Sequence, residues 1–300
     1  MASRSRDLDT TARPDVIAPW LPAVGNWQLA ELLGEGRWCQ VYRARPSTRD
    51  AATPADYAVK LAKRSASDTV AIRLLQREAV VAGEVSHPNL TSILSARVRR
   101  PPYYIVMPYL PGQTLEAALA DHDRLPTGEA AQIARQTVEA LAALHAAGWV
   151  HSDVKPGNIL VGSTGHVTLL DLGLARKSGG VGGIDGTTLA GTLAYTAPES
   201  FSSLVELGPA LDVYSLGVTL YRMVTGVLPF PQSDPAALAA AHLHHRPPSP
   251  RVFNPALDQR VVSLLEGMLE KQPSQRPSLD ELASWLEPFE AGPADRRIAA

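Results

Sequence analysis

The segment HSDVKPGNIL, which begins at His151, gathers four side chains whose types and spacing could support chemistry on a phosphate group. Asp153 beside Lys155 can orient a hydroxyl group and share its proton. The amide oxygen of Asn158 can bind Mg²⁺, which takes a few hard oxygen ligands from protein and the rest from phosphate. Asp171, thirteen residues later in LLDLG, supplies a second such ligand after an apolar strand. Each residue alone could merely cap local backbone, but the four spacings together favour a magnesium-dependent site.

A second candidate group is Lys60 in YAVK, which is flanked by apolar residues that should be buried. A lysine is almost never fully buried unless it is paired. Glu78, eighteen residues on, lies on the inner face of a predicted helix and is the available partner. The alternative is that Lys60 extends its ammonium group to solvent. The position of Lys60 between a glycine-bearing turn and an acidic helix residue favours the pair.

The glycine-bearing turn is GEGRWCQV, which contains Gly34, Gly36 and Val41. Glycines between two strands let backbone amides approach a phosphate without a Cβ in the way. A plain hairpin turn uses the same residues, so the fragment by itself is weak evidence. A dinucleotide-binding fold would place a helix after the glycines, whereas QVYRAR predicts a strand.

The elements that must position these residues divide the chain into a strand-rich part and a mainly helical part. The first folded part predicts a five-stranded antiparallel sheet with one helix, and its elements are two strands within 27–45, strands at 57–62, 90–98 and 103–109, and a helix at 68–84. After Pro111-Gly112 the pattern becomes mainly helical, with short strands at 158–161 and 166–170, a glycine-rich mobile stretch from Lys177, and helices at 127–148, 211–225, 234–244, 258–270 and 278–287. The predicted organisation is a flexible leader at 1–25, lobes at 26–110 and 111–290, and a frayed tail at 291–300.

Composition excludes several classes of protein. The 300 residues include 28 basic and 30 acidic ones, which gives a net charge of −2 and no basic excess for nucleic acid or an anionic membrane. The single cysteine, Cys39, excludes an intrachain disulfide framework and a cysteine-based zinc site. No apolar run is long enough to span a membrane, and the N-terminal segment lacks the apolar core of a signal peptide. We therefore expect a cytoplasmic protein.

In order and spacing, these motifs resemble those of bacterial eukaryotic-type (Hanks-type) Ser/Thr protein kinases over about residues 27–288. The matching segments are the glycine turn, Val59-Lys60, Glu78, HSDVKPGN, DLG at 171–173, GTLAYTAPE at 191–199, DVYSLG at 212–217 and Arg276-Pro277. The resemblance implies an α+β, bilobal protein kinase fold and an enzyme that transfers the γ-phosphoryl group of ATP, with Mg²⁺ or Mn²⁺, to Ser/Thr hydroxyls of protein substrates. It also implies autophosphorylation and a role in bacterial signalling, as a monomer or transient homodimer.

The resemblance further implies a role for each matching residue. The catalytic residues are Asp153, Lys155, Lys60, Glu78 and Thr192. Asp153 would orient the substrate hydroxyl, and Lys155 would neutralise charge on the γ-phosphoryl group. Thr192 would contact Asp153 and Lys155. The ATP-binding group is Gly34, Gly36, Val41, Ala58, Lys60, Met107, Tyr109, Leu110 and Leu160, and the metal ligands are Asn158 and Asp171. Structural pairs are Glu199 with Arg276, and Asp212 with the loop around Asp153. Ser178, Thr187 and Thr188 are candidate phosphorylation sites on the mobile loop.

The sequence departs from the family pattern at several places. Cys39 replaces the third glycine, which places a thiol near the phosphates. Ser152 replaces the arginine that usually receives a loop phosphate, so we expect loop phosphorylation not to be the main activating step. Pro108 in the hinge retains the carbonyl that adenine recognition uses. Gly157 and Ala194 stand where acidic residues often select basic substrates, so a requirement for upstream arginine is not expected.

Two other functions stay open at this point. A small-molecule phosphotransferase of the aminoglycoside or choline kinase type shares the H-x-D-x-x-x-x-N loop, but Lys155, the segment Ala197–Glu199 and DVYSLG argue against it. A pseudokinase scaffold would use the same fold for binding only, although every expected phosphate and metal residue is present.

Overall fold

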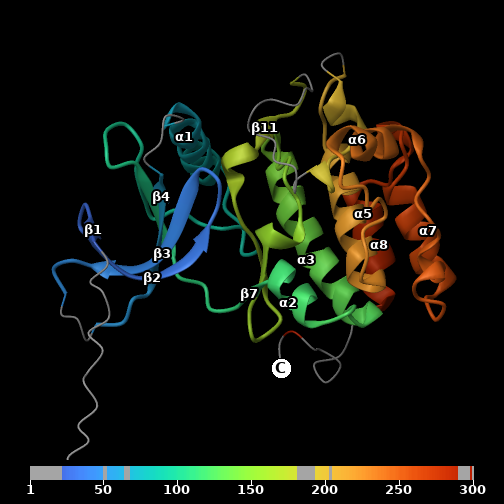
Figure 1. The fold of residues 1–300 in the computed structure, drawn as a ribbon, viewed down its shortest axis with the longest axis horizontal. Coiled ribbons are helices and arrows are strands. Elements are labelled where there is room, and N and C mark those ends of the chain that lie inside the picture. Colours follow the sequence, from blue (N-terminus) through green and yellow to red (C-terminus); the bar gives the residue numbers. More distant parts are fainter. Residues whose placement is uncertain are drawn as a thin grey trace, which may run out of the picture.

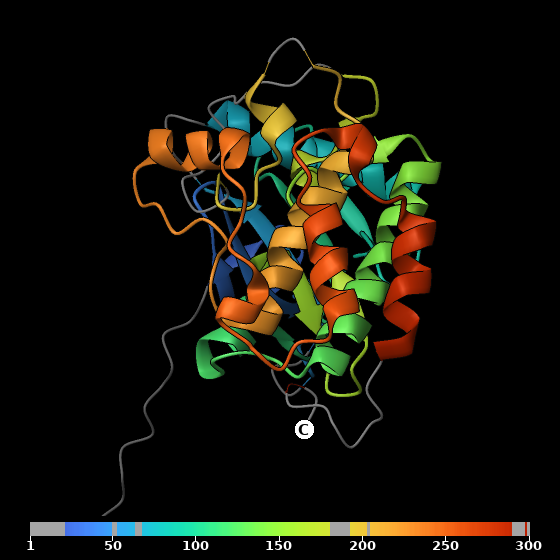
Figure 2. The same cartoon turned by 90° about the vertical axis from the view of Figure 1, so that its right-hand side faces the viewer.

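The computed structural model describes residues 22–49, 53–63, 68–180, 193–202, 205–289 and 298. A sheet and one helix form the N-terminal lobe, and a larger group of helices forms the C-terminal lobe (Figure 1). Figure 2 shows the C-terminal lobe in front, with the orange and red helices nearest the viewer and the blue strands behind them. The prediction of an α+β fold with two lobes is confirmed.

The N-terminal lobe contains a six-stranded sheet in the order β1-β2-β3-β4-β6-β5, in which every neighbouring pair is antiparallel. Its strands are Ala23–Val24 (β1), Trp27–Glu35 (β2), Cys39–Pro46 (β3), Tyr57–Ala62 (β4), Ser95–Arg97 (β5) and Tyr104–Pro108 (β6). The helix α1 spans Asp68–Glu84, and its Leu75 is buried in a cluster with Cys39 and Ile105. Side chains alternate across a strand, so Val59 packs in the opposite cluster while Ala58 and Lys60 line a cavity.

Two features of this lobe differ from the sequence prediction. The predicted leader at 1–25 contains β1, which pairs with β2 through Val24 and Trp27, so the sheet has six strands where the sequence predicts five. A two-residue strand carries no periodic signal, and that explains the omission. The strand predicted at 90–98 is reduced to β5, because the chain before it pairs instead across the lobes through Leu90 and Leu169.

The C-terminal lobe is built around one large apolar cluster to which most of its helices contribute. Its helices are Leu115–Asp121 (α2), Thr127–Ala146 (α3), Ala210–Thr225 (α5), Pro235–His244 (α6), Gln259–Met268 (α7) and Leu279–Leu286 (α8). Nearly every residue of α5 is buried, since other elements of the lobe surround it. The sequence predicts all of these helices except α2, which is too short for a clear helical period.

Short strands and 3₁₀ turns bring polar residues of this lobe to the edge that faces the N-terminal lobe. One small sheet has the order β10-β9-β7, with Gln113–Thr114 (β7), Ile159–Val161 (β9) and Val167–Leu169 (β10), and a second pairs Trp149–Val150 (β8) with Arg176–Lys177 (β11). The turns are Pro156–Asn158 (η1) and Leu172–Leu174 (η2). The segment that begins at His151 therefore leaves β8, and Asp171 follows β10.

Within the predicted frayed tail at 291–300, the structure describes Ile298. Its side chain belongs to the large apolar cluster, and its backbone N–H donates to Glu129 Oε1 at 2.8 Å. Glu129 is itself buried in the first turn of α3, so this bond helps to satisfy a buried carboxylate. A single large apolar side chain gives no periodic signal in the sequence. None of the helices in the described ranges is long and apolar enough to cross a membrane.

Candidate active site

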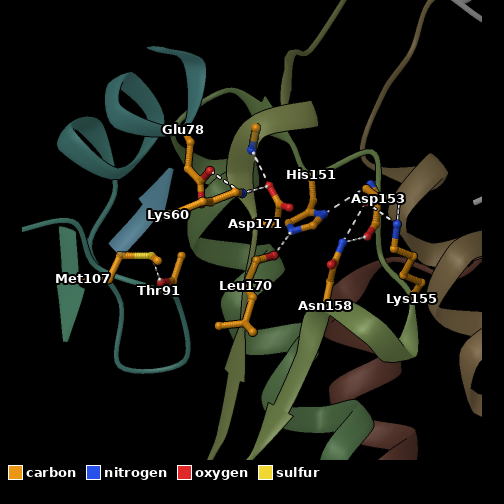
Figure 3. A network of polar contacts seen from close by, with 11 residues as sticks. Lys60, Glu78, Thr91, Met107, His151, Asp153, Lys155, Asn158, Leu170 and Asp171 are labelled. Carbon is orange, nitrogen blue, oxygen red and sulfur yellow. Dashed lines mark hydrogen bonds and ion pairs between the residues drawn. The ribbon is translucent and has the colours of Figure 1, made fainter. Parts of the chain in front are cut away.

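Lys60 pairs with two carboxylates, one in its own lobe and one in the other lobe. Its Nζ lies 2.7 Å from Glu78 Oε2 on α1 and 2.7 Å from Asp171 Oδ1 after β10 (Figure 3). The predicted pair with Glu78 is present, and the sequence reasoning did not foresee the contact with Asp171. Lys60 and Glu78 are both buried, which is sustainable because the ammonium group meets two opposite charges.

Burial and charge act against each other within this group. Burial alone would lower the pKa of Lys60, but the carboxylates of Asp171 and Glu78 outweigh it and raise that pKa. Burial, aided by the charge of Asp171, raises the pKa of Glu78 to about 7 although Lys60 opposes the shift. The pKa of Asp171 is lowered, because Lys60 outweighs the effect of burial. The ion pair of Lys60 with Glu78 is therefore sensitive to pH near neutrality, whereas that with Asp171 is not.

Asp153, Lys155 and Asn158 lie together as the sequence predicts. Lys155 Nζ is 3.0 and 2.7 Å from the two carboxylate oxygens of Asp153, and Asn158 Nδ2 donates to Asp153 Oδ2 at 2.8 Å. Asn158 Nδ2 also donates to the carbonyl of Asp153 at 2.8 Å, which closes the loop on itself. Burial raises the pKa of Asp153 despite the charge of Lys155, so this carboxylate is a better proton acceptor than an exposed aspartate.

The buried core of the C-terminal lobe holds this loop in place through Asp212. Its two carboxylate oxygens accept hydrogen bonds from the backbone N–H groups of His151 and Ser152, each at 2.8 Å, and Oδ2 also lies 2.8 Å from His145 Nε2. Asp212 is fully buried on α5. Ser152 adopts a left-handed backbone conformation with φ of 67°, and the bond to Asp212 favours that turn. The anchoring role that the resemblance implies for Asp212 is therefore matched by its contacts.

His151 connects the loop to the strand that carries Asp171. Its Nε2 lies 3.1 Å from the carbonyl of Leu170, and its Nδ1 accepts the backbone N–H of Asp153 at 3.2 Å. Both contacts fit a neutral ring with the proton on Nε2. Asp171 also has a left-handed backbone, with φ of 62°, and its Oδ1 accepts the N–H of Gly173 at 3.2 Å. These contacts fix the positions of the two carboxylates relative to each other (Figure 3).

A cavity of about 490 Å³ lies between the lobes, and its walls contain most of the predicted nucleotide-binding residues. The predicted residues in the walls are Gly34, Val41, Ala58, Lys60, Glu78, Met107, Tyr109, Leu110, Asn158, Leu160 and Asp171. Gly36 does not line the cavity. Its backbone N–H donates to the carbonyl of Cys39 at 2.9 Å and so closes the turn. The apolar walls fit a flat aromatic base, and the charged end at Lys60 and Asp171 fits phosphates.

Sequence reasoning missed several wall residues, including Leu33, Thr91 and Leu170. Leu33 and Leu170 directly precede Gly34 and Asp171, and that adjacency was the available signal. Thr91 lies beside the predicted gatekeeper, with its hydroxyl 3.6 Å from the sulfur of Met107. Its place could not be read from the chain, since the cross-lobe pairing of residues 90 and 169 sets it.

The hinge accommodates Pro108 without a lost hydrogen bond. Pro108 lies opposite Tyr57, and the adjacent ladder bond runs from the N–H of Tyr109 to the carbonyl of Asp56 at 2.9 Å. Residue 108 thus occupies a position that needs no N–H in the ladder. Because the N–H of Tyr109 is engaged, the carbonyl of Pro108 and the N–H of Leu110 are the hinge groups we expect to meet a base.

Cys39 lies apart from the cavity, contrary to the expectation of a thiol beside the phosphates. Its side chain is buried with Leu75 and Ile105, and burial raises its pKa to about 11. Side chains alternate along β3, so Cys39 and Val41 lie on the same face of the strand. Val41 lines the cavity, whereas Cys39 packs against α1. A buried thiol with a raised pKa is unreactive, which argues against a redox role.

The residues near Lys60 fit a magnesium ion bound together with phosphate. The hydrogen bonds of Asn158 described above use its Nδ2, and the contacts of Asp171 use its Oδ1, so one oxygen of each side chain lies outside these contacts. Both residues line the cavity. In the described ranges, no cluster of three or more His, Cys, Asp or Glu side chains could hold a metal by itself. Two oxygen donors beside a phosphate site are typical of Mg²⁺.

Some predicted residues lie outside the part of the chain that the structure describes. These are Thr192, Thr187 and Thr188, so the predicted contact of Thr192 with Asp153 and Lys155 stays a prediction. Ser178 is described and exposed just after β11. Downstream, Arg276 forms a bidentate pair with Glu199 at 2.6 and 2.8 Å, and both side chains are buried.

Comparison with known proteins agrees with this geometry. The family model described as "Protein kinase domain" matches residues 27–285. The human "Hormonally up-regulated neu tumor-associated kinase" is 33% identical over 269 residues, which covers 88% of this chain and 37% of the relative. The "Serine/threonine-protein kinase PrkC" of Bacillus subtilis is 31% identical over 253 residues, which covers 84% of this chain and 38% of the relative. This chain thus spans less than two fifths of the length of either relative, and over nearly all of its folded part it belongs to the protein kinase family.

Proposed function

We propose that this chain transfers the γ-phosphoryl group of ATP, in the presence of Mg²⁺, to serine and threonine hydroxyls of protein substrates. The observation that carries the proposal is the double contact of Lys60 with Glu78 and Asp171, at the charged end of a cavity that Asn158 also lines. The names of the related proteins support serine/threonine specificity. Mn²⁺ is an alternative ion, since it accepts the same oxygen ligands.

Each residue would contribute a distinct part of the chemistry. Lys60 would bind the α- and β-phosphates, with Glu78 holding its side chain in place. Asp153 would orient the incoming hydroxyl and accept its proton as the new P–O bond forms and the bond to ADP breaks. Lys155, which now contacts Asp153, is close enough to that carboxylate to neutralise charge on the transferred group. When bound through Asn158 and Asp171, Mg²⁺ supplies positive charge to the phosphate oxygens.

The base would bind in the apolar part of the cavity. Val41 and Ala58 line it from the sheet and Leu160 lines it from β9, so a flat ring could lie between them. The carbonyl of Pro108 and the N–H of Leu110 would recognise the edge of the adenine. Autophosphorylation on Ser178, Thr187 or Thr188, a bacterial signalling role and a monomeric or transiently dimeric state accompany this proposal.

The test compares wild type with Asp153→Asn in labelled ATP and Mg²⁺, with a generic unstructured protein as acceptor. We expect label on serine and threonine in wild type, and a loss of rate on the order of 10²–10⁴ in the variant, as for removal of a general base. ATP affinity should stay within about twofold, since Asp153 orients the acceptor and does not bind the base. Transfer only to small alcohols would favour the small-molecule phosphotransferase, and no transfer with intact ATP binding would favour a pseudokinase.

A further inference from the structure

The C-terminal end of α1 contacts the other lobe through the carboxylate of Glu84, in addition to the apolar packing of Val81 and Val85. Glu84, the last residue of α1, accepts the indole N–H of Trp149 at 2.7 Å through Oε2. The same oxygen lies 3.0 Å from Lys177 Nζ. Lys177 in turn lies over the indole ring of Trp149, 4.0 Å from its centroid. We call these three residues the Glu84 cluster.

The Glu84 cluster is attached to both segments that carry the chemistry. Trp149 and Lys177 are directly paired in the two-stranded sheet of β8 and β11. β8 leads into the loop of His151 and Asp153, whereas β11 follows Asp171 by five residues. A movement of Glu84 relative to this sheet is therefore a movement of α1 relative to both segments.

The position of Glu84 along α1 links it to Glu78. Six residues separate the two, which corresponds to a rise of about 9 Å along one rigid helix. A shift or rotation of α1 that broke the contacts of Glu84 would also move Glu78 away from Lys60. Trp149 is buried, so its N–H would lose its partner and the displaced state would leave a buried polar group unsatisfied. The two hydrogen bonds, from Trp149 and Lys177, also lower the pKa of Glu84, which keeps it ionised.

We propose that Glu84, Trp149 and Lys177 are positioning residues that hold α1 in the orientation in which Glu78 meets Lys60. The proposal rests on the phosphoryl transfer proposed above, and it assigns to the cluster a part in sustaining that activity. The residues do not line the cavity and do not contact the predicted reacting groups. Their effect should therefore appear in kcat and in the mobility of α1, with little change in the binding of the protein substrate.

The experiment uses the full chain and Glu84→Ala, with Glu139→Ala as a matched control. Glu139 is a similarly exposed glutamate that pairs with Arg135 on α3, away from α1. We expect kcat to fall about fivefold in Glu84→Ala, the low end for coupling between two sites, and to be unchanged in the control. Amide exchange over residues 75–84 should become about fivefold faster, whereas α5 should keep its protection. Glu84→Gln should lose less, because its amide oxygen can still accept the indole N–H.

A double-mutant cycle makes the test specific. Trp149→Phe keeps an aromatic ring and removes the N–H, and adding it to Glu84→Ala should cause little further loss, since both act through one contact. Lys177→Met serves as a second partner variant should Trp149→Phe not fold. Additive losses, or wild-type kcat and exchange in Glu84→Ala, would overturn the proposal. If wild type transfers no phosphate, the proposed function fails, and the exchange of α1 still decides whether the cluster positions the helix.

Discussion

Lys60 and Asn158 line the same cavity, but the two lobes hold their halves of the site in different ways. In the C-terminal lobe, the loop of Asp153 and Asn158 is fixed by hydrogen bonds to Asp212, which is buried on a helix inside the largest apolar cluster. In the N-terminal lobe, Lys60 is oriented by two carboxylates, one of them on α1. A buried carboxylate thus fixes the loop of Asp153 and Asn158 through backbone hydrogen bonds, whereas ion pairs orient Lys60.

The largest effect should come from removing the ammonium group of Lys60, which pairs with both carboxylates. Lys60→Met keeps much of the side-chain volume and deletes the charge, so we expect kcat to fall on the order of 10²–10³, as when one preorganised donor is lost. The C-terminal lobe should keep its stability, because its core does not include Lys60. Steady-state kinetics and thermal unfolding of the same sample test both statements. A variant that retains activity would show that Lys60 does not contact phosphate.

Breaking the anchor of the other half should cost stability as well as activity. Asp212→Ala leaves the buried N–H groups of His151 and Ser152 without their acceptor, so we expect a loss of about 3–5 kcal/mol in the free energy of unfolding, as for breaking a buried hydrogen-bonded charge. Denaturant titration measures it. A variant with wild-type stability would contradict the view that the hydrogen bonds to Asp212 fix the loop.

A moderate effect should follow pH. With the pKa of Glu78 raised to about 7, a fall in pH through neutrality protonates it and removes its ion pair with Lys60. We therefore expect kcat/KM to decrease below about pH 7, where Glu78 becomes neutral. Glu78→Gln should be less active and should lack this part of the profile. Any part of the pH dependence of kcat/KM that comes from Asp153, whose pKa is also raised, should persist in that variant. Identical profile shapes would exclude Glu78 as the titrating group.

The smallest effect should come from the loop threonines. Ser152 offers no cation to a loop phosphate, so Thr187→Ala and Thr188→Ala should each change kcat by less than about twofold. Phosphoryl transfer by each variant measures it, with enzyme stripped by phosphatase as the control. Near-complete inactivation of Thr188→Ala would show that a loop phosphate finds another partner.

The sequence predicted the site better on the side where local spacing carries the information. Asp153, Lys155 and Asn158 belong to one loop of a few residues, so their proximity follows from the chain itself. The Lys60 pair could be inferred because a lysine among apolar residues requires a partner. The contact of Lys60 with Asp171 depends on how the lobes meet, and no local pattern encodes that.

The parts that escaped prediction share a physical cause. β1 and α2 are too short for a periodic signal, and Ile298 is held by a hydrogen bond to Glu129 far away in sequence. Cys39 occupies the family position of a glycine but is buried against Leu75 of α1 and Ile105 of β6. Tertiary contacts set each of these, whereas the sequence pattern reports the local backbone.

The most direct test is a crystal structure of the wild-type chain with a non-hydrolysable ATP analogue and Mn²⁺, in which anomalous scattering locates the ion. We expect the base between Val41, Ala58 and Leu160, a phosphate in contact with Lys60 Nζ, and the ion bound by Asn158 and Asp171. An analogue bound elsewhere, or an ion that contacts neither Asn158 nor Asp171, would contradict it.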